Sequence, residues 1–219
     1  CIRKAVVENM ESMSHYPATS GSMALREAIA GWIERRYGAR LDPATQVLPV
    51  LGSREALFSF TQSHIDASGS EKPVVLIPCP FYQIYEGATL MAGAEPVYMP
   101  LTKENGYKPD LSAIGEDVLR RTQLLYVCSP GNPTGVTMKL EDWKVLFELA
   151  DRWNFAIVSD ECYSEIYFEE GKAPLGALTA AKLLGRDDYR NIIIMQSLSK
   201  RSNAPGMRSG FVAGDAKLI

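Results

Sequence analysis

The segment 191–214, NIIIMQSLSKRSNAPGMRSGFVAG, joins an apolar run to an irregular loop and a second short apolar run. Its first part, 191–196, is typical of a buried strand, and the proline and glycines that follow indicate a loop. In this loop two serines, Ser197 and Ser199, precede Lys200, and Arg208 follows it; these residues are suited to a small anionic ligand such as an aldehyde that carries a phosphate. Taken alone, Lys200, Arg201 and Arg208 are more often ordinary solvated charges of a surface loop. A binding role for them therefore depends on what the rest of the sequence indicates.

Short apolar runs alternate with helical patterns along the rest of the chain. The runs lie at 47–51, 74–77, 96–99, 124–128, 155–159, 192–195 and 211–213. Helical patterns are found at 22–37, from Ser53, from about Tyr82 and at 140–153. Runs without polar alternation, separated by helices, predict an α/β fold with a mainly parallel central sheet and helices on both faces. Because such sheets bind ligands beyond the carboxyl ends of their strands, the residues after each run are candidates for a site.

Four of the predicted strand ends carry unusual residues. They are GSRE at 52–55, PCPFYQIY at 78–85, SPGNPTG at 129–135 and DECY at 160–163. Gly52 permits a tight turn, and Ser53 is expected to cap a helix whose free N–H groups face an anion. Asp160, Asn132 and Tyr82 each have an ordinary alternative role, as a turn residue or as half-buried packing. Their joint placement at the strand ends of one sheet favours a binding site.

The composition argues against several other classes of function. The 219 residues, 46% of them hydrophobic, suffice for one large domain. A net charge of −3 without a basic run argues against nucleic-acid binding, and no apolar segment is long enough to span a membrane. The glycine-rich loops that hold dinucleotides or nucleoside triphosphates are missing as well.

Cysteine and histidine usage bears on metal binding and location. Cys1, Cys79, Cys128 and Cys162 lie far apart, with no closely spaced pair. The two histidines have no metal-ligand spacing. We therefore expect four reduced thiols, no metal site and a cytoplasmic protein.

The motifs SPGNPTG, SDECY and SLSKRSN…GMRSG together resemble the class I/II aminotransferases of fold type I, which use pyridoxal 5′-phosphate (PLP). The resemblance runs from about His15 to Gly214. It implies an α/β, three-layer large domain with a mainly parallel central sheet. Residues 1–21 would form an N-terminal arm, and 22–219 a PLP-binding large domain that is incomplete at its C-terminal end, where the small domain is absent.

The resemblance also implies roles for individual residues. Lys200 would bind PLP covalently and later move a proton between the substrate α-carbon and the cofactor. Asp160 would face the pyridine nitrogen and keep it protonated. Tyr163 and Asn132 would hydrogen-bond the phenolic oxygen of PLP, and Tyr82 would stack on its ring. Lys200, Asp160 and Tyr163 are thus the expected catalytic residues.

A second group of residues would hold the cofactor phosphate. Ser197 and Arg208 would contact it together with the backbone N–H groups of Ser53 and Arg54. Tyr16 resembles a tyrosine of the family that reaches the phosphate bound by the neighbouring subunit. The resemblance therefore implies a homodimer in which each site is completed by the partner.

The substrate is predicted from a narrower resemblance. PFYQIYEGA, QLLYVCSPGNPTG and the final loop are similar to the succinyldiaminopimelate aminotransferases of bacterial lysine biosynthesis. The implied substrates are N-succinyl-LL-2,6-diaminopimelate, 2-oxoglutarate and glutamate. The alternatives are an aminotransferase for aspartate, aromatic or LL-diaminopimelate substrates, then a PLP-dependent β-lyase, then a non-enzymatic regulator domain. The arginine that binds the substrate α-carboxylate in the family would lie in the small domain, beyond this chain.

Overall fold

The computed structural model describes residues 2–219, so Cys1 lies outside the described part. The helices are α1 (Ile2–Glu8), α2 (Met23–Tyr37), α3 (Ser53–His64), α4 (Ile84–Met91), α5 (Glu116–Arg121), α6 (Leu140–Trp153), α7 (Ala177–Leu183) and α8 (Leu198–Arg201). The strands are β1 (Val47–Val50), β2 (Val74–Cys79), β3 (Glu95–Pro100), β4 (Thr122–Cys128), β5 (Ala156–Asp160), β6 (Ile192–Ser197) and β7 (Gly210–Gly214).

The strands form one seven-stranded sheet in the order β1-β7-β6-β5-β4-β2-β3. Neighbours from β6 to β3 pair in parallel, whereas β7 is antiparallel to both β6 and β1. The predicted α/β architecture with a mainly parallel sheet is therefore confirmed. The carboxyl ends of β2, β4, β5 and β6 consequently open on the same edge of the sheet.

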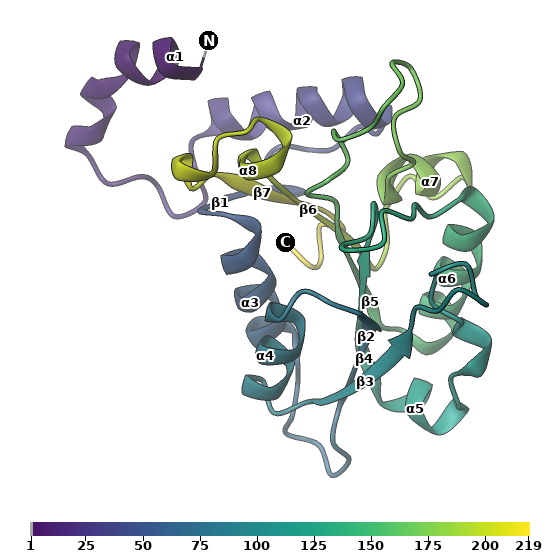
Figure 1. Cartoon of the computed structure of the whole chain (residues 1–219). Coiled ribbons are helices and arrows are strands. Elements are labelled where there is room, and N and C mark those ends of the chain that lie inside the picture. The colour runs from purple at the N-terminus through teal and green to yellow at the C-terminus, as the bar shows by residue number, and fades with distance from the viewer. Residues whose placement is uncertain (1) are drawn as a thin grey trace.

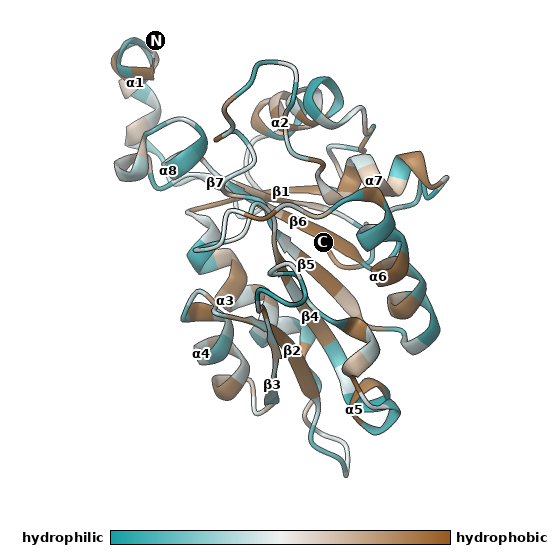
Figure 2. Cartoon of the chain, turned by 45° about the vertical axis from the view of Figure 1, so that its right-hand side comes forward, coloured by the Kyte–Doolittle hydropathy of each residue, from teal (hydrophilic) through white to brown (hydrophobic). Residues whose placement is uncertain are grey.

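Helices cover both faces of this sheet and give the molecule three layers (Figure 1). Helices α3 and α4 pack on one face over Val75, Ile77, Tyr126 and Val158, while α2, α5, α6 and α7 pack on the other face. Successive residues of β2 and β4 alternate between the two cores, as the pleat of a strand requires. Figure 2 shows the apolar residues concentrated on the strands and on the helix faces turned toward them.

The helix boundaries follow from local sequence. Ser22 caps α2 by accepting a hydrogen bond from the N–H of Leu25, and Gly38 ends the helix in the left-handed conformation at φ 65°. Helix α6 covers the residues that its pattern predicts, and Asn154 ends it with φ 55°. These ends support the predicted helices at 22–37 and 140–153.

The structure adds three short helices, α5, α7 and α8, that the sequence patterns did not predict. Each has seven residues or fewer, which is too short for an apolar period to emerge. Helix α1 lies away from the sheet and the helices that cover it (Figure 1), and residues 3–20 are exposed. Within residues 2–219, no helix is long and apolar enough to cross a membrane.

Candidate functional site

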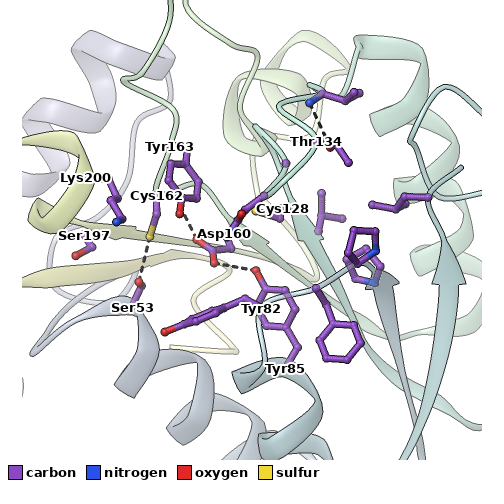
Figure 3. Close-up of a pocket in the computed structure, with 18 of the residues that line it drawn as sticks. Ser53, Tyr82, Tyr85, Cys128, Thr134, Asp160, Cys162, Tyr163, Ser197 and Lys200 are labelled. Atoms are coloured by element: carbon purple, nitrogen blue, oxygen red, sulfur yellow. Dashed lines mark hydrogen bonds between the residues drawn. The ribbon is translucent and has the colours of Figure 1, made fainter. Parts of the chain in front are cut away.

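A cavity of about 560 Å³ lies at the carboxyl edge of the sheet, where four strands end. Nine residues predicted for the site line it: Ser53, Arg54, Tyr82, Asn132, Asp160, Tyr163, Ser197, Lys200 and Arg208. Figure 3 shows several of them around one space. The tenth, Tyr16, is not among the lining residues and is fully exposed on the arm.

Asp160, the last residue of β5, is a buried acid at this cavity. Tyr85 donates its hydroxyl to Oδ2 of Asp160 over 2.8 Å, and the N–H of Cys162 donates to Oδ1 over 3.2 Å (Figure 3). Burial raises the pKa of Asp160, and these two donors partly offset that effect. The site thus holds a desolvated carboxyl group whose orientation is fixed from two sides.

The loop after β6 brings the predicted lysine to the cavity. The sequence predicted an irregular loop here, but Leu198–Arg201 form one helical turn because Ser197 Oγ accepts the N–H of Ser199 over 3.1 Å. Lys200 lies on this turn, with Nζ 6.0 Å from the ring centre of Tyr163. Arg201 points elsewhere and packs its guanidinium 4.2 Å from the ring centre of Trp32.

Helix α3 begins at another side of the cavity. The expectation that Ser53 caps this helix is wrong, because Gly52 holds the cap position and Ser53 is its first helical residue. The Ser53 hydroxyl instead accepts a hydrogen bond from the thiol of Cys162 over 3.0 Å. Gly52 has φ 151°, and a Cβ there would lie 2.4 Å from Nη2 of Arg208. Only glycine permits this close approach.

The Arg208 guanidinium lies beside Gly52, at the start of α3. Its Nη2 donates to both carboxylate oxygens of Glu55, over 2.9 and 3.0 Å. Both side chains are about half exposed. The guanidinium therefore keeps other N–H groups for an anion.

Aromatic side chains form one wall of the cavity. Tyr82 precedes α4 and accepts a hydrogen bond from Nε of Arg54. Its ring meets Tyr85 edge-on at 6.0 Å, and Tyr85 stacks on Tyr126 at 4.5 Å. A flat ligand beside Tyr82 would therefore meet a fixed ring.

The sequence interpretation missed several residues of the cavity, namely Glu55, Tyr85, Cys128, Cys162 and Ser199. Tyr85 follows Tyr82 by three residues, a helical spacing that could have placed both on one face. Burial raises the pKa of the Cys128 thiol to about 12, so this thiol stays protonated. The described cysteines, Cys79, Cys128 and Cys162, are free thiols.

The residues present fit PLP. The cofactor has a basic ring nitrogen on one side and a phosphate on the other, with a flat ring between them. The cavity offers a buried acid at Asp160, hydroxyls and a guanidinium at Ser53, Ser197 and Arg208, and the ring of Tyr82. The missing Cβ at Gly52 leaves room for the Arg208 guanidinium beside the start of α3. Among residues 2–219, no cluster of three or more His, Cys, Asp or Glu could hold a metal ion.

Comparisons with known proteins identify the family. The family model described as aminotransferase class I and II matches residues 1–219. A protein of Dehalococcoides mccartyi named LL-diaminopimelate aminotransferase is 41% identical over 206 residues, covering 93% of this chain and 50% of the relative. An aminotransferase structure from Neisseria meningitidis Z2491 has a TM-score of 0.94 at 50% identity, covering 99% of this chain and 55% of that one.

A second solved structure, aminotransferase AspB from Helicobacter pylori 26695, has a TM-score of 0.90 at 40% identity and covers 99% of this chain and 56% of that one. The chain thus spans about half the length of the relatives it matches. The family match itself extends over the whole chain. The chain therefore belongs to the class I and II aminotransferases, a family of PLP-dependent enzymes.

Proposed function

We propose that this chain forms the cofactor-binding part of an aminotransferase active site. The observation that carries the proposal is that Asp160, at the end of β5, shares one cavity with Lys200 and Arg208, which both come from the segment between β6 and β7. An acid, an amine and a guanidinium in one cavity match the ring nitrogen, the aldehyde and the phosphate of PLP. The division into an arm at 1–21 and a PLP-binding domain at 22–219 is part of the proposal.

Three residues carry the proposed chemistry. The Lys200 amine binds the cofactor and then moves a proton to and from the substrate α-carbon. Asp160 keeps the ring nitrogen protonated and forms an ion pair with it. Because Asp160 is buried, this ion pair is stronger than it would be in water. Bound there, PLP supplies a sink for the electron pair of the α-carbon. Tyr163, with Asn132, hydrogen-bonds the phenolic oxygen.

The remaining site residues orient the cofactor. Ser197, Arg208 and the backbone N–H groups of Ser53 and Arg54 bind its phosphate, and Tyr82 stacks on its ring. The start of α3, a helix of 12 residues, adds the partial positive charge of its N-terminus. Tyr16 is proposed to act on the phosphate of a second copy, since its arm position leaves it exposed. This role makes the protein a homodimer.

For the substrate we propose LL-diaminopimelate as amino donor and 2-oxoglutarate as acceptor. Several relatives at 35–41% identity are named LL-diaminopimelate aminotransferase, which favours this member of the predicted alternatives. The succinylated substrate predicted from the sequence has the same backbone with its distal amine blocked. It remains the second candidate.

The first experiment adds PLP to the chain, reduces it with borohydride and maps the adduct. A pyridoxyl group on Lys200 is expected, and an adduct elsewhere would contradict the assignment. Activity is then measured in the native protein with LL-diaminopimelate and its succinylated form. Amino transfer to 2-oxoglutarate from the free diamino acid alone supports the proposed substrate, and transfer from the succinylated form alone supports the second candidate. Release of pyruvate and ammonia from cysteine-type substrates without an oxo acid would indicate a β-lyase instead.

A further inference from the structure

Tyr85 is a buried phenol in direct contact with the acid of the site. Its side chain is 1% exposed, and its hydroxyl donates to Oδ2 of Asp160 over 2.8 Å (Figure 3). The residue lies in the first turn of α4, so the contact joins a helix on one face of the sheet to the end of β5. None of the roles that the family resemblance implies involves this contact between Tyr85 and Asp160.

Two donors bind the Asp160 carboxylate, one on each oxygen. The N–H of Cys162 holds Oδ1 over 3.2 Å, and Tyr85 holds Oδ2. The Cys162 contact is made by the backbone and is set by the turn after β5. The Tyr85 contact depends on one side-chain hydroxyl, so it can be removed without changing the backbone. Together they fix the plane of a carboxylate that lines the cavity.

Tyr85 is itself held in place by its neighbours. It stacks on Tyr126 with ring centres 4.5 Å apart and an interplanar angle of 15°. Tyr82 meets it edge-on at 6.0 Å. The hydroxyl of Tyr126 bonds to Thr61 rather than to the acid. A ring confined on these sides cannot turn its hydroxyl away from Asp160 without repacking the core.

We propose that Tyr85 is the positioning residue for the cofactor's ring nitrogen. It holds the Asp160 carboxylate ionised and in the orientation that pairs with the protonated nitrogen. Because Tyr82 lies three residues earlier, the start of α4 sets both the plane of the ring and the orientation of the acid. This inference rests on the proposed function.

The electrostatics of the site agree with this role. Burial raises the pKa of Asp160, which favours the neutral acid, and the hydrogen bond from Tyr85 opposes that effect. A neutral acid could not hold a proton on the ring nitrogen. Burial and the nearby Asp160 charge in turn raise the pKa of Tyr85 well above its ordinary value, so the phenol stays a donor.

The test compares Tyr85→Phe with the matched control Tyr126→Phe. Both replacements remove one buried phenol oxygen from the same stacked pair. Thr61 keeps a partner in the control, since it also donates to the carbonyl of Leu57 over 2.8 Å. Each variant is titrated with PLP and with 1-deazapyridoxal 5′-phosphate, in which a CH group replaces the ring nitrogen. The second probe keeps the aldehyde and the phosphate but cannot pair with Asp160.

Tyr85→Phe is expected to weaken PLP binding about tenfold, the change for losing one hydrogen bond to a charged group. Its affinity for the deaza analogue should stay within about twofold of wild type, which also shows that the variant is folded. With ¹⁵N-labelled PLP, the ring-nitrogen resonance should move toward the unprotonated value in Tyr85→Phe and stay in Tyr126→Phe.

Equal weakening of both probes, loss of deaza-analogue binding, or an unchanged PLP affinity would overturn the positioning role. None of these outcomes would contradict the proposed function, provided that the wild-type chain forms the PLP adduct at Lys200. Failure of the wild-type chain to form that adduct would instead remove the proposed function, and this inference with it.

Discussion

Asp160 and Glu161 are consecutive residues, but their buried carboxyl groups bond toward different helix layers of the sheet. Asp160 accepts the hydroxyl of Tyr85 from α4. Glu161 Oε1 accepts the N–H of Ala177 at the start of α7 over 2.8 Å and the hydroxyl of Ser159 over 3.0 Å. The end of β5 is thus anchored on both sides of the sheet, and one of the two anchors lies outside the cavity.

Glu161→Gln should change how stability depends on pH. Burial raises the pKa of Glu161 in the folded protein, whereas the unfolded chain titrates near about 4.3. The wild-type carboxyl therefore stabilises the fold fully below about pH 4.3, and this contribution is lost as the pH rises through the raised pKa. The glutamine keeps an oxygen that can accept both bonds and does not titrate. Urea unfolding should show the variant gaining stability relative to wild type from about pH 4 to about pH 7.

The matched control for this measurement is Glu148→Gln, which replaces an exposed carboxylate near Lys144 on α6. Its effect should stay within about 0.5 kcal/mol at every pH, as for most surface substitutions. A stability difference between Glu161→Gln and wild type that does not vary with pH would contradict the raised pKa.

Gly52→Ala should destabilise the chain and weaken PLP binding together. The added Cβ would lie 2.4 Å from Nη2 of Arg208, at a residue with φ 151°. Backbone strain of this kind costs about 1–3 kcal/mol, and the displaced guanidinium leaves the proposed phosphate site. The control is Gly87→Ala on α4, where a Cβ meets nothing within 4 Å. That control should stabilise the chain by about 0.5–1 kcal/mol in urea unfolding and leave the PLP affinity unchanged.

The sequence predicted much of the cavity because its residues follow strands, and parallel strands bring their carboxyl ends to one edge. Asp160 and Ser197 are such residues. Contacts made across layers could not be predicted in this way. The bond between Tyr85 and Asp160 depends on how α4 packs on the sheet, and the ion pair between Glu55 and Arg208 depends on where the last loop folds. The cap of α3 was predicted at Ser53, one residue too late, because the glycine before it can also serve as a helix cap.

Glu55→Gln and Arg208→Ala should change PLP affinity in opposite directions. Arg208→Ala removes a charge-assisted contact to the phosphate and should weaken binding by about 1.5–3 kcal/mol, or about 10- to 150-fold. Glu55→Gln removes the carboxylate that pairs with Arg208, so affinity should rise about two- to fivefold, the scale of an exposed ion pair. Glu86→Gln, which changes a carboxylate bonded to Tyr98, serves as control. Fluorescence titration with PLP measures all three, and equal affinities for wild type and Arg208→Ala would remove the phosphate role.

Lys200→Ala should abolish the covalent PLP adduct, while Lys108→Ala should keep it. Both lysines line the cavity, which makes Lys108 a control for the amine that reacts. Lys108 is held in an ion pair with Asp142, which engages its amine. Lys200 has no such ion pair among the described residues, and it reaches the cavity from the turn that Ser197 caps. Borohydride reduction followed by peptide mapping should place the pyridoxyl group on residue 200 in wild type and Lys108→Ala, and on no residue in Lys200→Ala. A label that moves to Lys108 only when Lys200 is missing would still support Lys200 as the native site, whereas a label on Lys108 in wild type would reassign the reactive amine.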